Sequence, residues 1–205
     1  MLGKRTHRSK SEERHPQPDN KRAKYSDELH SNTDPDNLRE IKADLLEFRL
    51  AECIAQQSNC VTRKGSGLYK SIVDKYPSVD IYKMRDHHSI PGSALQMKID
   101  GSEKEDPNPK YVMHMFAQYY PGKCIIPADD AESRIEWFKD CLADIASQNM
   151  IKSIAFPKNI GCGLAGGDWN IYRRCLKDFA QKNPHIQVYI VDNSRPKRKE
   201  TLNAC

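Results

Sequence analysis

The sequence contains no long apolar run: no stretch approaches the roughly 18 consecutive apolar residues that a membrane-crossing helix requires. Residues 1–24 also lack the apolar segment that forms the centre of a secretory signal peptide. The seven cysteines form no CxxC pair and none of the usual zinc spacings. We therefore expect no membrane association, no metal site and no disulfide framework, and we expect buried thiols in a reducing compartment.

Apolar residues are also scarce at both ends, where positive charge gathers instead. The chain of 205 residues has a net charge of +5. Residues 1–24 hold eight Lys/Arg and three Asp/Glu, a net charge of +5. Residues 195–205 hold four Lys/Arg and one Glu, a net charge of +3. The segment between them therefore has a net charge of −3. Polar ends of this kind cannot bury enough surface to offset the entropy of ordering. We expect a disordered basic tail over 1–37, one folded domain over 38–193 and a basic tail over 194–205.

The tails contain basic clusters, Lys21-Arg22-Ala23-Lys24 and Arg195-Pro196-Lys197-Arg198-Lys199 among them. Such clusters are typical of nuclear import addresses and of segments that bind polyanions, although a solubilising tail explains them equally well. We expect a nuclear or cytoplasmic protein whose tails could bind import receptors or nucleic acid. The acidic segment between the tails argues against a nucleic-acid-binding face on the domain itself.

Between the tails, apolar stretches typical of strands alternate with amphipathic stretches typical of helices. We expect strands over residues 41–46, 53–55, 82–84, 94–99, 111–117, 151–156 and 186–191. We expect helices over residues 68–76, 130–147 and 169–183. The alternation predicts right-handed crossovers and an α/β fold with an at least partly parallel sheet.

The most informative segment is FPKNIGCGLAGGDW, residues 156–169, where a buried strand leads through a loop into a helix. Four glycines fall within the seven residues 161–167. Glycines let the main chain approach an anion closely, and free N–H groups together with a helix N-terminus supply partial positive charge to phosphate oxygens. A plain tight turn seldom needs so many glycines. The segment therefore predicts a phosphate-binding loop.

Two other phosphate-binding motifs fit this loop less well. Gly161-Cys162-Gly163-Leu164-Ala165-Gly166 has the GxGxxG spacing of a dinucleotide-binding fold, but that unit opens a long domain, whereas one strand follows here before the basic tail. No Gly-Lys-Ser/Thr follows the glycines, which excludes a Walker loop.

A second junction of the same kind lies earlier, in CIAQQSNCVTRKGSGL, residues 53–68. Two junctions of strand, glycine loop and helix in one small domain suggest a diphosphate held between them, at the carboxyl ends of the strands. Asn59 offers a donor and an acceptor suited to a ribose hydroxyl, or it forms a turn.

These two segments, together with IKADLLEF (residues 41–48), resemble the macro domain family over roughly residues 38–192. The resemblance points to the branch that contains ADP-ribose-1''-phosphate phosphatases and terminal ADP-ribose protein glutamate hydrolases. It implies a three-layer α/β/α fold with a mixed, largely parallel central sheet, ADP-ribose or ADP-ribose-1''-phosphate as ligand, and no cofactor. It also implies that Asp44 accepts the adenine amino group and that Asn59 contacts the distal ribose. The other ligand-binding residues expected are Gly65, Ser66, Gly67, Leu68, Pro157, Ile160, Gly161, Cys162, Gly163 and Leu164.

The resemblance to the glutamate-hydrolase branch does not extend to its catalytic residues. That branch uses a lysine nucleophile and an aspartate directly after Gly-Cys-Gly-Leu. Here Ala165 takes the aspartate's place, and the segment where the lysine would stand reads Arg85-Asp86-His87-His88-Ser89. Asp168 remains a candidate general base, or it caps the following helix. His87 and His88 could donate a proton, or they lie in solvent. We interpret Cys162 as loop packing and His114 as a core histidine.

We expect an enzyme that hydrolyses ADP-ribose-1''-phosphate or the ester that links ADP-ribose to a protein. The alternative is a non-catalytic reader of ADP-ribosylated proteins, localised by its basic tails. Family resemblance alone does not separate the two, because function depends on the site and not on the fold.

Overall fold

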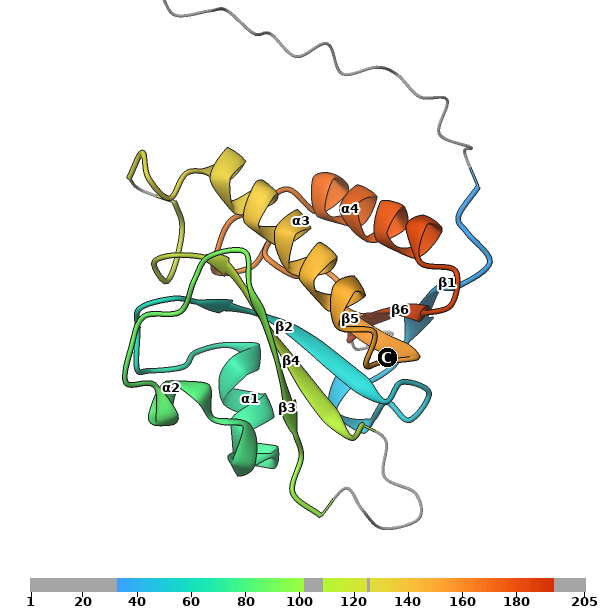
Figure 1. Ribbon diagram of the computed structural model, residues 1–205, viewed down its shortest axis with the longest axis horizontal. Coiled ribbons are helices and arrows are strands. Elements are labelled where there is room, and N and C mark those ends of the chain that lie inside the picture. Colours follow the sequence, from blue (N-terminus) through green and yellow to red (C-terminus); the bar gives the residue numbers. More distant parts are fainter. Residues whose placement is uncertain (1–32, 102–108, 125, 194–205) are drawn as a thin grey trace, which may run out of the picture. The chain divides into compact units, whose positions relative to one another are not determined.

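The structure is a computed structural model that describes residues 33–101, 109–124 and 126–193 (Figure 1). The tail predictions for 1–32 and 194–205 lie outside the described residues. Within these ranges the elements follow one another in this order: β1 (Leu38–Lys42), η1 (Leu45–Glu47), β2 (Cys53–Asn59), α1 (Leu68–Lys75), η2 (Pro77–Val79), α2 (Ile81–Met84), β3 (Ala94–Lys98), β4 (Tyr111–Gln118), α3 (Ala131–Gln148), β5 (Ser153–Pro157), α4 (Trp169–Lys182) and β6 (Gln187–Asp192).

The strands form one six-stranded sheet in the order β1-β6-β5-β2-β4-β3. All neighbours pair in parallel except β3, which runs antiparallel to β4 at one edge. The predicted α/β fold with a mixed, largely parallel sheet is therefore confirmed. Because β2, β4 and β5 are parallel, their carboxyl ends lie at the same edge of the sheet.

Helices cover both faces of the sheet, with α3 and α4 on one side and α1 and α2 on the other (Figure 1). The core under α3 and α4 includes Phe138, Ile145 and Leu176, all 0–1% exposed. The opposite core includes Leu45 and Ile72, equally buried. Each of these side chains contributes about 1.5–3 kcal/mol through burial. The two apolar cores hold the sheet in place, and the two glycine-bearing loops extend from one edge of it.

Two strand predictions were wrong. Residues 82–84 belong to helix α2, because the Asp80 carboxylate accepts a hydrogen bond from the Lys83 N–H and so starts a helical turn. The strand expected over 41–46 ends at Lys42, and Leu45–Glu47 forms a 3-10 helix capped by Asp44. In both places, a local side-chain bond to the main chain overrides the apolar pattern.

The packed chain starts upstream of Leu38. The Asn37 side chain donates hydrogen bonds to the carbonyls of Ala180, in the last turn of α4, and of Asn183 and Ile186, which follow the helix. The Asp34 carboxylate lies 2.7 Å from Nη2 of Arg173 on α4. These contacts attach the first described residues to α4.

The six described cysteines are free thiols, and Cys53, Cys141 and Cys175 are buried as expected. Among the described residues, no helix is long and apolar enough to cross a membrane.

Candidate functional site

A cleft of about 570 Å³ lies at the sheet edge where β2, β4 and β5 end. Both glycine-bearing loops contribute to its lining, loop 1 between β2 and α1 and loop 2 between β5 and α4. The cleft is lined by Gln56, Gln57, Asn59, Lys64, Ser66, Gly67, Leu68, Tyr69, Tyr82, Gln118, Pro121, Gly122, Pro157, Lys158, Asn159, Ile160, Gly161, Gly163, Leu164 and Ala165. Its size is that of a small-ligand site.

Asn59 is the last residue of β2, and its side chain organises the first residues of loop 1. Its Oδ1 accepts hydrogen bonds from the N–H groups of Val61 (3.2 Å) and Thr62 (2.8 Å). Its Nδ2 donates to the Tyr82 hydroxyl at 2.9 Å. Asn59 lines the cleft, and its amide is already engaged in forming the turn. The turn-forming interpretation is therefore confirmed, and the ribose contact stays a prediction.

Loop 1 ends at Gly67, which precedes α1 with φ 59°, a conformation that favours glycine. No side chain caps the start of α1. The first N–H groups of a helix have no partner within it, so an uncapped start can bind an anion.

Loop 2 is closed on itself by main-chain hydrogen bonds, including Gly167 N–H to the Gly161 carbonyl at 3.0 Å. Gly161 has φ 73°, and a Cβ there would meet the Tyr172 ring and lie 2.6 Å from Gln57 Oε1. Only a residue without a side chain fits at this position. In contrast to α1, the start of α4 is capped, because Asp168 Oδ1 accepts from Asn170 N–H at 2.8 Å.

The two loops approach each other across the cleft. Cδ1 of Leu164 on loop 2 lies 3.4 Å from the position that a Cβ on Gly67 of loop 1 would occupy. Leu164 is nevertheless 65% exposed. Of the residues expected to bind ligand, those that line this shared cleft are Asn59, Ser66, Gly67, Leu68, Pro157, Ile160, Gly161, Gly163 and Leu164.

Three other residues expected to bind ligand are not part of the lining. Gly65 packs close to the Tyr69 ring. Asp44 is exposed and caps the 3-10 helix through a 2.9 Å bond from Leu46 N–H to its Oδ1. Burial, reinforced by the charge of Asp168, raises the pKa of Cys162 to about 11, which keeps its thiol protonated near neutral pH.

The three catalytic candidates also lie off the cleft lining. Asp168 caps α4. His87 is highly exposed, with its Nε2 3.5 Å from the Asp86 carboxylate, and His88 Nδ1 lies 3.2 Å from the Tyr119 hydroxyl. The described lining residues carry charge at Lys64 and Lys158 and include no Asp, Glu or His. The cleft as described thus offers main-chain and amide groups, with the Lys64 ammonium at its side, while the Lys158 ammonium is paired with Asp192.

Sequence reasoning missed the amide floor of the cleft. Gln56 and Gln57 come from the end of β2 and Gln118 from the end of β4, and Gln57 Nε2 donates to Gln118 Oε1 at 2.8 Å. The strand prediction stopped at residue 55 because the residues that follow are polar. Their position after two central strands was the available signal, since residues at the carboxyl ends of such strands face the ligand crevice.

Arg85 was also missed. It lies in the segment where the glutamate-hydrolase branch would have its catalytic lysine, yet its guanidinium donates to the carbonyls of Asn59 (2.7 Å) and Thr62 (2.8 Å). It also lies 4.7 Å from the centre of the Tyr82 ring. Arg85 therefore holds loop 1 in place.

No group of three or more His, Cys, Asp or Glu side chains within the described ranges could hold a metal ion.

No protein-family model matches the sequence, and no curated protein matches it. Solved structures do match. The macrodomain of Mycobacterium tuberculosis DarG is 18% identical with a TM-score of 0.59, and the match covers 77% of this chain and 98% of that one. The macrodomain of Oceanobacillus iheyensis is 15% identical with a TM-score of 0.56, covering 77% and 84%. A Streptomyces coelicolor macrodomain protein is 16% identical with a TM-score of 0.55, covering 77% and 99%. The chain therefore adopts the macrodomain fold.

Proposed function

We propose that the cleft binds ADP-ribose and that the protein recognises this group, free or attached to protein. One observation carries the proposal: both glycine-bearing loops line a single cleft at the carboxyl ends of parallel strands. The resemblance of the two loop sequences to macro domains, together with the fold, supports ADP-ribose as the diphosphate that fits there.

The main chain supplies the attraction for the diphosphate. Gly67 leads into the uncapped start of α1, where partial positive charge from the helix favours an anion. Gly161 brings the backbone of loop 2 to the opposite side of the cleft. Lys64 adds positive charge beside loop 1, whereas the Lys158 ammonium is paired with the Asp192 carboxylate at 3.0 Å. The amides of Gln57 and Gln118 on the floor can exchange hydrogen bonds with neutral hydroxyl groups.

Recognition fits the cleft better than hydrolysis, because its described lining holds no carboxylate or imidazole that could serve as general base or acid. Hydrolysis of ADP-ribose-1''-phosphate or of an ADP-ribosyl ester is the second candidate. It is favoured by the position of Asp168 at the end of loop 2, directly before α4.

Calorimetry with ADP-ribose tests the binding proposal. We expect saturable binding to one site, and at least about tenfold weaker binding of AMP, which lacks the second phosphate and the distal ribose. No heat signal at millimolar ADP-ribose, or equal affinity for AMP, would contradict the proposed site.

Turnover assays separate the two candidates. Wild-type protein is incubated with ADP-ribose-1''-phosphate and with glutamate-ADP-ribosylated protein, and product is measured beside Asp168→Asn and Asp168→Ala. Asn caps helices as well as Asp does, whereas Ala loses about 1 kcal/mol of cap stabilisation. A catalytic carboxylate predicts that both variants lose turnover. A reader yields no product with any of the three proteins, and Asp168→Asn then matches wild type in both stability and affinity.

A further inference from the structure

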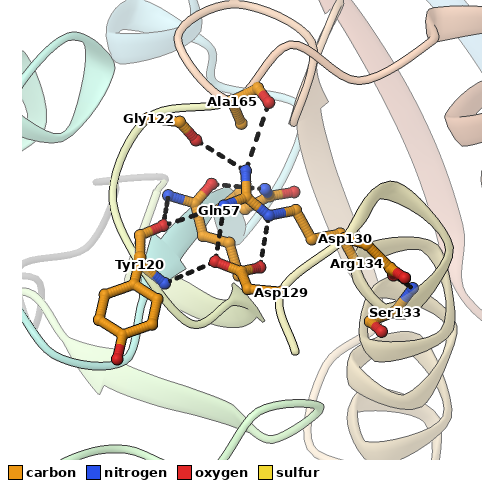
Figure 2. A network of polar contacts seen from close by, with 9 residues as sticks. Gln57, Tyr120, Gly122, Asp129, Asp130, Ser133, Arg134 and Ala165 are labelled. Carbon is orange, nitrogen blue, oxygen red and sulfur yellow. Dashed lines mark hydrogen bonds and ion pairs between the residues drawn. The ribbon is translucent and has the colours of Figure 1, made fainter. Parts of the chain in front are cut away.

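A buried ion pair, Arg134 with Asp129, lies against the main-chain carbonyls of Gly122 and Ala165 (Figure 2). Arg134, in the first turn of α3, is 2% exposed, and Asp129, just before α3, is 1% exposed. Arg134 Nε donates to Asp129 Oδ1 at 2.6 Å, and Nη2 donates to Oδ2 at 2.7 Å. This parallel, charge-assisted geometry fixes the plane of the guanidinium group.

The remaining donors of Arg134 hold main-chain carbonyls from two different segments. Nη1 donates to the carbonyls of Gly122 (2.7 Å) and Ala165 (3.3 Å), and Nη2 donates to the Tyr120 carbonyl at 3.3 Å. All five guanidinium N–H groups therefore have acceptors. Gly122 follows β4 and Ala165 belongs to loop 2, and both residues line the cleft.

The same network continues into the floor of the cleft. Asp129 Oδ2 accepts from the Tyr120 N–H at 2.8 Å, and Gln118 Nε2 donates to the Tyr120 carbonyl at 3.2 Å. Gln118 in turn accepts from Gln57, whose Oε1 lies beneath Gly161. One set of hydrogen bonds thus connects the start of α3 with the floor of the cleft, and Gln57 packs against loop 2.

The start of α3 does not need this pair for its own capping. Asp130 Oδ1 accepts from the Ser133 N–H at 2.7 Å and caps the helix. Well-packed apolar residues in place of a buried ion pair are often as stable as the pair itself. Apolar residues could not, however, donate hydrogen bonds to three main-chain carbonyls, as Arg134 does.

We propose that Arg134, oriented by Asp129, is a positioning residue that sets the separation of the cleft walls at Gly122 and Ala165 before ligand arrives. A single nitrogen, Nη1, bonds to both walls, so neither wall moves independently of the other. A loop that is already held in its ligand-bound position loses less conformational entropy when ligand binds, so the affinity is higher. This inference rests on the proposed function, because the ligand whose affinity reports it is ADP-ribose.

The variant Arg134→Lys tests the inference, since lysine keeps the charge beside Asp129 but lacks the planar five-donor fork. The matched control is Arg173→Lys on α4, where the native arginine bonds to Glu40 and Asp34 and does not line the cleft. At a temperature where both variants are fully folded, we expect about tenfold weaker ADP-ribose binding for Arg134→Lys and unchanged binding for Arg173→Lys. In ligand-free Arg134→Lys, we expect faster amide hydrogen exchange over residues 120–124 and 163–167.

Each outcome decides the inference. If Arg134→Lys lowers the unfolding temperature but leaves affinity and loop exchange unchanged, the role is merely structural and the inference is wrong. If wild type itself does not bind ADP-ribose, the proposed function fails, while hydrogen exchange without ligand still shows whether Arg134 positions the loop. If Arg134→Lys does not fold, Asp129→Asn replaces it, because it keeps Arg134 but weakens the ion pair that orients the guanidinium. Weaker ADP-ribose binding with faster loop exchange supports the positioning role, and unchanged affinity and exchange overturn it.

Discussion

Gly161 and Gly163 stand two positions apart in loop 2 under different constraints. Gly161 combines a positive φ of 73° with contacts that leave no room for a side chain, to the Tyr172 ring and to Gln57 Oε1. Gly163 has no positive φ, and a Cβ there would meet no atom within 4 Å. Backbone conformation and close neighbours therefore require glycine at position 161, and neither requires it at position 163.

We therefore expect Gly161→Ala to lower the free energy of unfolding by about 1–3 kcal/mol and to weaken ADP-ribose binding by tenfold or more. The matched variant Gly163→Ala is expected to keep wild-type stability, because its new methyl group lies in open space. Urea unfolding and calorimetry measure the two effects. Equal damage from both substitutions would show that the strain assigned to Gly161 is not the cause.

Among the secondary-structure elements, β4 carries a titratable group into the core. His114 is fully buried, and its Nδ1 lies 2.8 Å from Gln56 Nε2. Burial lowers the pKa of His114 to about 3, so the imidazole is neutral in the folded protein. In the unfolded chain the same group takes up a proton near pH 6.5.

Because the unfolded state binds the proton first, stability is complete above about pH 6.5 and falls as the pH drops towards 3. At pH 5, His114 alone is expected to lower the free energy of unfolding by about 2 kcal/mol relative to pH 7.5. Urea unfolding at both pH values checks this, with His114→Gln as the control that removes the contribution. An identical loss in wild type and in the variant would assign the pH dependence to other groups.

The elements also show what could be predicted from the sequence. The long helices α3 and α4 were predicted to within a few residues, because their amphipathic patterns repeat over several turns. The four-residue helix α2 was missed, because one carboxylate cap determines it. Both glycine loops were found, since each is a contiguous segment between a strand and a helix.

Other parts of the candidate site depend on contacts between distant segments. Gln57 and Gln118 are 61 residues apart, and Arg134 reaches Ala165 across 31. No local pattern reports such partners, so the amide floor and the buried ion pair emerged only from the structure. The side chain of Asn59 was likewise expected to be available to ligand, whereas the fold engages it with Tyr82 and the loop backbone.

For the whole molecule, the uneven distribution of charge along the chain predicts that polyanion binding and ADP-ribose binding belong to different parts of the chain. The basic clusters lie within residues 1–24 and 195–205, whereas the segment between them is net −3. A protein lacking residues 1–32 and 194–205 is expected to bind ADP-ribose within about twofold of the full chain and to lose salt-sensitive binding to heparin or nucleic acid. Calorimetry and binding at two salt concentrations measure these affinities. Persistent polyanion binding by the shortened protein would place a basic surface on the domain instead.

The exposed leucine between the two loops has a thermodynamic consequence. Leu164 is 65% exposed although it stands at the cleft, next to Gly67. A nucleotide seated between the loops would remove this isobutyl group from water, and burial of apolar surface lowers the heat capacity of a complex. Association with a highly charged ligand would therefore become more exothermic on warming, as is typical of apolar contact and not of phosphate recognition alone.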